Sequence, residues 1–409
     1  MKRVPILAIA MSLIISSPLL AFPIAVTTNS GGNAGAVATA FDLLDPSDPD
    51  VAFLDNFLSF ATDPQLQCDF DQMHTAMFNA IPIADEMATL AIRASLSDRL
   101  EEVHGPLCER ESFEEMCMGF WLAPIANFNK QNSRSQHGEC DQTKVGFNVD
   151  TYGITAGWDG AWSDYFVLGG ALSYAHTHVS WKESLAHASM NNGYASLFGT
   201  LYNRIAYLDV AVIGAYNHCS AERTIRLQNI FTKIKRKADH DNHAGQLDTH
   251  LGFGFTWNPA NHDGVFCYQL RPFANLDYLI VHESGYTESG AKSIDLDVKW
   301  KNSDLIREEI GLSFVTWRLG TCVEWSQELS LSYVHEDRIR GKHSKEHFVD
   351  SDHEFEVHGF LPDRDLVAPG GGIRLFFPAK NISLALRYAG EFGDEWKNQT
   401  GSAELLWSF

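Results

Sequence analysis

The sequence predicts an all-β membrane protein, an antiparallel transmembrane β-barrel of about twelve strands with an N-terminal α-helix in the pore. Three observations lead to this prediction. From residue 119 to residue 409, apolar and polar residues alternate in segments of roughly 10–16 residues. The connections between these segments are alternately tight and long. The chain then ends on an alternating segment whose last residue is Phe409.

The alternation is clear in segment 247–257. Its apolar face consists of Leu247, Leu251, Phe253, Phe255 and Trp257. The positions between them are polar or small and include Asp248 and His250. The pattern alone also fits a soluble β-sandwich whose apolar face points inward. We favour the barrel because aromatic residues lie near the expected strand ends, where a membrane girdle needs them: Trp121, Trp158, Trp162, Tyr165, Tyr202, Trp257, Tyr278 and Trp325.

The lengths of the connections also favour a barrel. Tight turns are expected at 159–163, 203–206, 258–264, 319–323 and 378–381. Long connections are expected at 130–143, 181–189, 220–244, 282–303 and 338–365. In outer-membrane barrels the short turns face the periplasm and the long loops face outside. A further alternating run, 293–300, would make the strand number odd, so we assign it to an extended part of the loop after the seventh strand.

The N-terminus has the layout of a secretory signal peptide. Lys2 and Arg3 precede an apolar stretch over 4–15, and the small residue Ala21 follows. The stretch is short for a membrane span, although an uncleaved anchor is the alternative. We therefore predict a signal peptide over 1–21 and export through the periplasm. Beyond it, no run of about 18 apolar residues occurs.

Two stretches lie between the signal peptide and the barrel. Residues 22–68 are weakly patterned and are interpreted as a short vestigial passenger or linker. Over 69–104, apolar residues such as Met87 recur at three- and four-residue steps, which predicts a helical pore segment. Pro82 should kink or divide this helix. Its polar residues, among them Arg93 and Arg99, suit a polar lumen.

Charged residues on the inward face of the expected strands are candidates for contacts inside the barrel. They are Arg271, Asp277, Arg374, Arg387 and Glu404. These side chains could pair with the helix or line a water-filled lumen. Either role is electrostatic and structural rather than catalytic.

Net charge and cysteine spacing exclude several classes of protein. The net charge of -21 argues against nucleic acid as a partner, because phosphates would be repelled. The seven cysteines contain no CxxC spacing and so no zinc knot or thioredoxin-like motif. Local disulfides among Cys108, Cys117 and Cys140 are possible after export, and small apolar fillers are the alternative.

The residues that carry a family resemblance lie in three blocks. They are the opening strand Gly-Phe-Trp-Leu-Ala-Pro at 119–124, the glycine-rich hairpin at 145–181, and the segment 270–278 with its Arg-Pro-aromatic sequence followed by Tyr286, Thr287, Glu288 and Gly290. Together they resemble the C-terminal translocator domain of autotransporters, the type V secretion proteins. This resemblance covers 119–409 and, more loosely, the helix. It implies a bacterial outer-membrane protein that is handled by the Sec translocon and the barrel assembly machinery and is surrounded by outer-membrane lipid.

The last strand looks like the membrane-insertion signal of such barrels. Counted back from the carboxyl end, Phe409, Trp407 and Leu405 share one face. An aromatic terminal strand of this kind is read by strand pairing at an open edge of the assembly machinery.

The sequence departs from the family in having almost no passenger, which leaves three function classes. The leading one is translocation or display of the N-terminal segment at the cell surface. The alternative is a stand-alone envelope protein or adhesin that displays its outer loops, and the third is a barrel enzyme. No Gly-x-Ser-x-Gly or His-Glu-x-x-His motif occurs, so we predict no enzymatic activity and no cofactor.

Two outer loops carry residues that could bind ligands. Lys233, Lys235, Arg236 and Lys237 could touch acidic lipid head groups, host glycans or another envelope ligand, and a solvated loop is the alternative. The loop 338–365 contains His343, His347, His353 and His358 with Asp350 and Asp352. Such a set could bind a metal, but a flexible polar loop explains it more simply, so we predict no metal site.

Overall fold

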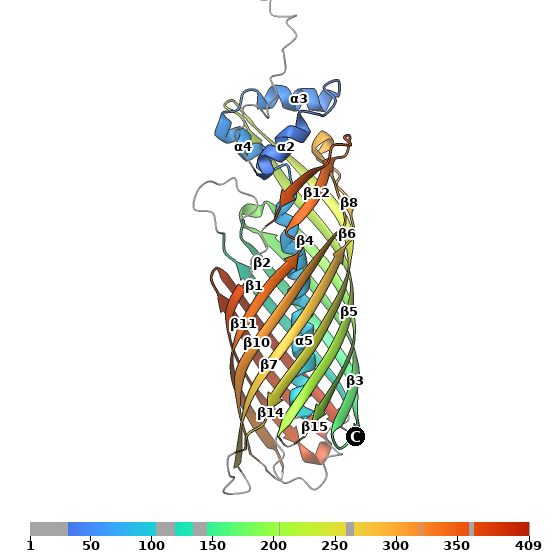
Figure 1. Cartoon of the computed structure of the whole chain (residues 1–409), viewed down its shortest axis with the longest axis vertical. Helices are drawn as coiled ribbons and strands as arrows, with labels where there is room; N and C mark the ends of the chain where they lie inside the picture. Colours follow the sequence, from blue (N-terminus) through green and yellow to red (C-terminus); the bar gives the residue numbers. More distant parts are fainter. Residues whose placement is uncertain are drawn as a thin grey trace, which may run out of the picture.

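The computed structural model describes residues 32–103, 119–133, 145–203, 205–258, 266–318, 320, 322–359 and 364–408. Within them the main body is a closed antiparallel barrel of twelve strands, in the order β1-β16-β15-β14-β11-β10-β7-β6-β5-β4-β3-β2 (Figure 1). The barrel closes where β1 pairs with β16, from Gly119 opposite Ser408 to Gln131 opposite Trp396. The predicted fold class is confirmed.

The barrel strands have the following bounds: β1 Gly119–Gln131, β2 Phe147–Ser163, β3 Phe166–Trp181, β4 Ala186–Tyr202, β5 Ala206–Gln228, β6 Lys233–Phe255, β7 Phe266–Glu283, β10 Lys301–Arg318, β11 Glu324–Arg340, β14 Arg364–Phe377, β15 Ile382–Gly393 and β16 Trp396–Ser408.

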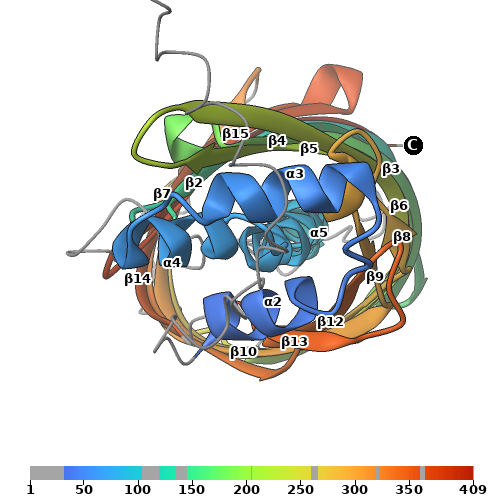
Figure 2. The ribbon, with the colours of Figure 1, turned by 90° about the horizontal axis from the view of Figure 1, so that it is seen from above.

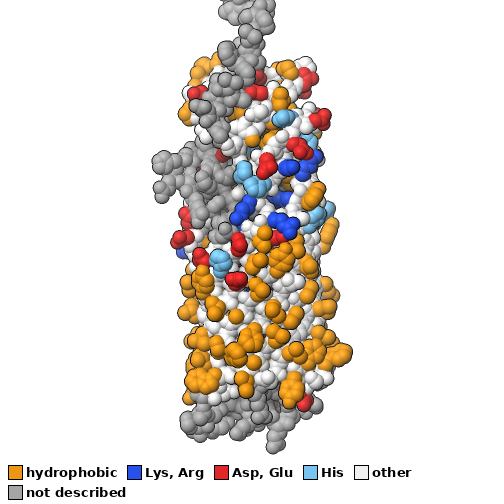
Figure 3. Space-filling view, viewed as in Figure 1, with side chains coloured by type: hydrophobic (Ala, Val, Ile, Leu, Met, Phe, Trp, Pro, Cys, Tyr) orange, Lys and Arg blue, Asp and Glu red, His pale blue; other side chains and the backbone are white. Residues whose placement is uncertain are grey.

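The apolar face of the strands points outward. On β6, Leu251 is 45% exposed, whereas its neighbour His250 is 5% exposed. Figure 3 shows apolar side chains over the lower part of one face, with charged and histidine side chains gathered above them. A soluble sandwich would bury the apolar face instead, so the outward band identifies a barrel surrounded by lipid.

Two of the expected girdle aromatics point the other way. Trp158 and Trp257 are exposed as expected, but Trp121 and Tyr202 are buried inside the barrel. Trp121 lies across Gly157, its partner in the β1–β2 register. A Cβ at Gly157 would lie 2.4 Å from the indole ring. The glycine therefore makes room for an aromatic that packs on the pore helix and not on lipid.

Several expected loops are strands. The connection 220–244 is a continuation of β5 and β6, which stay paired as far as Gln228 opposite Lys233. This extension lies beyond the apolar band, so its outer face is polar and reads as a loop in the sequence. The loop expected at 181–189 shrinks to the few residues between β3 and β4, and residues 159–163 belong to β2. The turn at 378–381 lies between β14 and β15 as predicted, whereas those expected at 203–206, 258–264 and 319–323 include residues outside the described ones.

The connections expected at 282–303 and 338–365 contribute a second, four-stranded sheet with the order β13-β12-β9-β8, whereas most of the loop expected at 130–143 lies outside the described residues. Its strands are β8 Tyr286–Thr287, β9 Leu296–Val298, β12 His343–Phe348 and β13 Phe355–His358. The run 293–300 contains β9 and therefore lies outside the barrel wall, as predicted.

Three short helices cover the end of the barrel that carries this sheet. They are α2 Asn33–Phe41, α3 Pro49–Leu58 and α4 Asp63–Asp71 (Figures 1 and 2). Sequence analysis found only weak patterning over 22–68 because each helix is short. Local signals for them do exist: Asp48 caps α3 ahead of Pro49, and Thr62 forms a capping box with Gln65. We call α2, α3 and α4 the cap.

The 3-10 helix η1 Ala76–Asn79 leads into the pore helix α5 Ala80–Val103. The pore helix begins at Ala80 and not at 69, and the boundary expected there falls inside α4. Pro82 does not kink α5, because it lies in the first turn, where its missing N–H has no intrahelical partner. None of the described helices is both long and apolar enough to cross a membrane.

The helix α5 runs along the inside of the barrel (Figure 2). Near its start, Phe78 packs edge-on against Trp181, where β3 ends. Near its end, Val103 packs against Tyr202 and Tyr207, beside the tight turn between β4 and β5. The chain therefore descends from the capped end to the tight-turn end before β1 begins.

Candidate functional site

The lumen around α5 is lined by ion pairs, which occur at several levels along the helix. In the middle, Arg93 lies 2.5 Å from Asp277 of β7. The same carboxylate accepts a hydrogen bond from His250 of β6 at 2.6 Å. All three side chains are buried. The inward charge Asp277 and the helix residue Arg93, singled out separately in the sequence, thus meet in one cluster.

Near the tight-turn end, Arg99 makes a two-pronged contact with Asp159 of β2. Its Nε and Nη2 each donate to one carboxylate oxygen at 2.7 Å. Its Nη1 donates to Glu102 at 2.6 Å. A bidentate pair of this geometry fixes both the depth and the rotation of the helix.

The acidic end of α5 is held by arginines from the wall. Arg387 of β15 donates to Glu101 at 2.6 Å and lies 3.2 Å from Asp98. Arg374 of β14 pairs with Glu102 and lies 3.7 Å from Glu404 of β16. Arg387, Arg374 and Glu404 therefore face the lumen.

Arg271 of β7 is also buried inside, where its Nε bonds Gln269. Met87 of α5 is buried as well, within an apolar cluster that includes Phe147, Val179 and Trp181 of the wall. Each inward charge and pore-helix residue singled out in the sequence thus lies in the lumen.

The upper end of α5 has partners that sequence analysis missed. Arg338 of β11 donates to Glu86 at 2.7 Å, and both side chains are buried. Just before α5, Lys301 of β10 donates to Asn79, the last residue of η1, at 2.6 Å. The sequence pattern assigns Arg338 to a loop, which hides its inward direction. A longer β11 in the strand assignment would have revealed it.

A second group of charges lies within the wall. Arg307 of β10 donates to Glu336, its direct partner on β11, at 2.7 Å, and also pairs with Glu391. Arg364 of β14 donates to Glu336 at 3.1 Å and stacks on Trp396 at 3.7 Å. Sequence analysis missed this cluster, although Arg307 and Glu336 both occupy inward positions of the alternation.

The cap is joined to the barrel by an apolar core of its own. Leu54, Leu58 and Phe70 of the cap are fully buried in one cluster with Ile225 and Leu227 of the β5 extension. Phe41 packs edge-on against Phe70 at 5.9 Å and Phe348 at 6.2 Å, measured between ring centroids. Burial of one such side chain contributes roughly 1.5–3 kcal/mol, so several together hold the cap firmly.

Polar contacts between the cap and the β5–β6 hairpin fix the orientation of the cap on the barrel. Asp50 of α3 accepts two hydrogen bonds from Arg236 at 2.7 Å and two from Ser293, one from its hydroxyl at 2.6 Å and one from its backbone N–H at 3.3 Å. Burial by itself raises the pKa of Asp50, but the bonds from Arg236 and Ser293 outweigh it and lower the pKa below its ordinary value. Arg236, expected as part of a solvated basic loop, instead fastens the cap.

Asp69 of α4 is held differently. Its carboxylate accepts the backbone N–H of Gln228 at 3.0 and 3.2 Å. Burial raises the pKa of Asp69 to about 7, because the single N–H donor does not compensate for the lost hydration.

The expected insertion signal lies partly within the described residues. Trp407 is 61% exposed and Leu405 45% exposed, and both lie on the outer face of β16. Phe409 lies outside the described residues. The disulfides considered for Cys108, Cys117 and Cys140 also lie outside them, whereas Cys68 of α4 is disulfide-bonded and Cys219 is buried.

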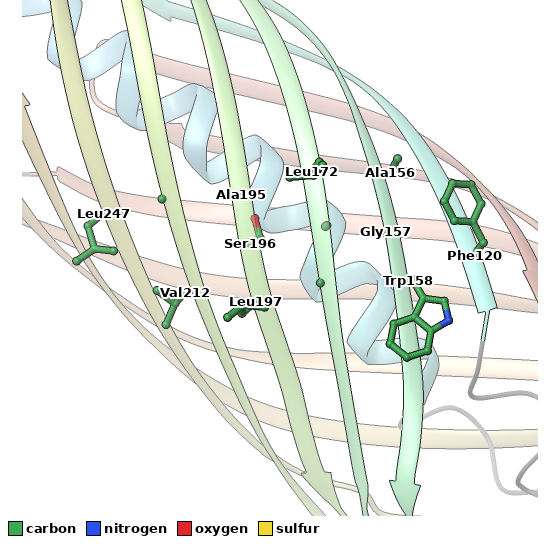
Figure 4. A pocket seen from close by; sticks show the side chains of 13 residues that line it. Phe120, Ala156, Gly157, Trp158, Leu172, Ala195, Ser196, Leu197, Val212 and Leu247 are labelled. Carbon is green, nitrogen blue, oxygen red and sulfur yellow. The ribbon is translucent and has the colours of Figure 1, made fainter.

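A shallow hollow on the barrel's outer surface is lined by small and apolar residues. Phe120, Trp158 and Leu172 border it, with Leu197 and Leu247 opposite (Figure 4). No titratable side chain is among its lining residues. The hollow lies on the apolar outer face of the strands, which faces lipid in barrels of this kind.

Comparison with known proteins agrees with this architecture. The model of the autotransporter β-domain family matches residues 120–389. Outer membrane protein A of Rickettsia rickettsii is 28% identical over 224 residues, and its counterpart in Rickettsia conorii is 25% identical over 221 residues. Each match covers 51% of this chain but only 9% and 10% of those relatives.

Two solved structures are similar in fold. The translocator domain of the autotransporter NalP from Neisseria meningitidis has a TM-score of 0.57 and 13% identity, and the match covers 82% of this chain and 100% of that one. The β domain of the Bordetella autotransporter BrkA has a TM-score of 0.51 and 14% identity, with 71% and 99% covered. With its closed barrel and the family match over most of its length, this chain belongs to the autotransporter β-domain family and is a protein of the bacterial outer membrane.

Proposed function

We propose that this chain carries its own N-terminal segment through the barrel to the cell surface and keeps it there as a docked cap. The observation that supports this most directly is the course of α5. It runs from the cap at one end of the lumen to the tight-turn end, where β1 begins at Gly119 opposite Asp159, so the cap and the start of β1 lie at opposite ends of the barrel. In barrels of this kind tight turns face the periplasm, which assigns the cap to the outside.

The contacts that attach the cap to the barrel indicate that the cap stays displayed at the cell surface and is not released. Its apolar core is shared with the β5–β6 extension and the four-stranded sheet. The contacts of Asp50 and Asp69 with the same hairpin orient it. A cap released from the barrel would expose Leu54, Leu58 and Phe70 to water, at a cost of several kcal/mol.

The partners of this route follow from the proposal. The signal peptide at 1–21 would engage the Sec translocon, and the terminal strand with Leu405, Trp407 and Phe409 would be read by the barrel assembly machinery. Outer-membrane lipid would surround the apolar band. Inside the lumen, ion pairs hold α5 against the barrel wall. Their role is structural, which supports a transport barrel without enzymatic activity of its own.

Surface labelling of two epitope-tagged variants tests the proposal. One tag is placed in the exposed turn at 45–47 within the cap, and the matched tag in the tight turn at 164–165 between β2 and β3. We expect antibody to label the first tag on intact cells and the second only after the outer membrane is permeabilised. Labelling of only the second tag would reverse the orientation and contradict the proposal.

The alternative, a stand-alone envelope protein whose outer loops bind a ligand, makes a different prediction about assembly. A fast-folding domain fused before residue 32 should keep a cap that is translocated through the lumen inside the cell. The reason is that a folded domain is too wide to pass a lumen that encloses a single helix. A cap that docks independently of the lumen should reach the surface with or without that fusion.

A further inference from the structure

The hairpin formed by β12 and β13 presents three potential metal ligands on one exposed face. His343 begins β12 and lies directly opposite His358, which ends β13. Glu356 stands two residues before His358 and therefore on the same face. Nδ1 of His343 lies 3.2 Å from a carboxylate oxygen of Glu356, and the two imidazole centroids are 4.4 Å apart. One ligand atom from each residue lies within 4.8 Å of the other two.

The backbone register brings the two histidines together. The Gly359 N–H donates to the Lys342 carbonyl at 2.9 Å, so residues 342 and 359 form a hydrogen-bonded pair. Hydrogen-bonded and non-hydrogen-bonded pairs alternate along an antiparallel ladder. The next pair, His343 with His358, is therefore of the non-hydrogen-bonded kind, in which side chains approach most closely.

The same alternation connects the pair to the cap. In a non-hydrogen-bonded pair the backbone groups point away from the partner strand. The His358 N–H donates to the side chain of Asn33 at 2.8 Å, and the Asn33 amide donates to the His358 carbonyl at 2.9 Å. Asn33 is the first residue of α2, so the cap is tied to the backbone of one of the three potential ligands.

We propose that His343, His358 and Glu356 form a binding site for one divalent transition-metal ion of the Zn²⁺, Ni²⁺ or Cu²⁺ class. Two imidazoles and a carboxylate suit these ions and not Ca²⁺ or Mg²⁺, which prefer oxygen ligands. Bonds of about 2.0–2.2 Å in a tetrahedral site place ligand atoms roughly 3.4 Å apart, so the three exposed side chains close on the ion with rotations alone. Water completes the coordination.

Binding would cross-link the two arms of the hairpin. Asn33 is hydrogen-bonded to His358. The ion therefore stabilises the β12–β13 hairpin to which α2 is docked. Lys345, opposite Glu356 in the register, is exposed, so its flexible side chain is free to turn its ammonium group into solvent when the ion binds.

The test is metal binding by the full chain folded in detergent. Zn²⁺ is titrated by calorimetry, and Cu²⁺ is followed by electron paramagnetic resonance. We expect one saturable site, with coupling of Cu²⁺ to two nitrogens. The double variant H343Q/H358Q should lose at least about tenfold in affinity and the nitrogen coupling. The matched control H347Q changes a histidine on the same strand that is outside the cluster and should bind as the parent does.

Two results would overturn the proposal. One is the absence of a saturable site in the parent chain. The other is unchanged affinity in H343Q/H358Q, which would place the bound ion among other histidines of the chain. The altered side chains are exposed, so the barrel should fold, and the shift of the folded band on heating verifies this for each variant.

Discussion

Arg99 of the pore helix and Asp159 of β2 form a bidentate ion pair, with two N–H···O contacts of 2.7 Å, and both side chains are shielded from water. The pair joins α5 to the wall beside the tight turns. It therefore fixes the end of α5 that is opposite the cap.

Removal of one partner of this pair should destabilise the plugged barrel strongly. Arg99→Met leaves the Asp159 carboxylate buried without its main partner, at a cost of about 3–5 kcal/mol. The double variant R99M/D159L should recover part of this loss. The denaturant midpoint of the folded band in semi-native electrophoresis measures the change. Lys380→Met, an exposed site in a tight turn, is the control. If the losses in stability of R99M and D159L alone add up to the loss in R99M/D159L, the two residues are not energetically coupled.

Substitution of Gly157 should displace Trp121 from the lumen. In Gly157→Ala the new Cβ would lie 2.4 Å from two carbons of the indole ring. The ring must move against α5, so we expect a loss of about 1–3 kcal/mol in stability. Gly193→Ala on β4 is the matched control, because nothing lies within 4 Å of its Cβ. Equal losses at both glycines would attribute the effect to the strand backbone and not to the indole.

Docking of the cap should weaken as pH rises toward neutrality because of Asp69. The docked form has a pKa of about 7, whereas an exposed carboxyl group titrates near ~3.9. The docked state therefore holds the proton more tightly. Asp69 therefore contributes at most about 4 kcal/mol to the free energy of cap docking. This contribution is complete below pH ~4 and is lost as pH rises from there to about 7.

Amide exchange of α4 between pH 5 and 8, corrected for the intrinsic rate, measures this effect. Asp69→Asn retains an oxygen acceptor for the Gln228 N–H but cannot ionise. Its protection should be independent of pH and should exceed that of the parent chain at pH 8. Protection that increases with pH in the parent would refute the assignment to Asp69.

Polar substitutions on the outer face of β16 should reduce assembly more than equally exposed substitutions on another strand. We expect L405S/W407S to reduce the fraction of chains that reach the folded, heat-modifiable form at least about tenfold, because in the proposed route the barrel assembly machinery recognises this strand by strand pairing. The control L329S/L331S removes two comparably exposed leucines from β11. If both doubles reduce assembly equally, contact with lipid alone explains the loss.

Sequence analysis was most successful where lipid imposes a two-residue period. Segment 247–257 and the last strand alternate so strictly because one face must be apolar and the other must suit a polar lumen. Beyond the apolar band this constraint ends. The extension of β5 and β6 past Ser220, with water on one side and the cap on the other, therefore reads as a loop in the sequence. The three cap helices are weakly patterned because each is short, and their apolar residues pack on the small sheet and the β5 extension and not on lipid.

The sequence by itself determined the class of the molecule, the inward or outward direction of most strand residues, and the presence of a helix before the barrel, because each depends on local periodicity. Only the tertiary structure decided the partners: Arg99 with Asp159, Arg93 with Asp277, and Asn33 with His358. These pairs join residues far apart in the chain, and which charge meets which depends on barrel closure, strand register and the depth of α5. Periodicity determines the direction of a side chain but not what lies opposite it.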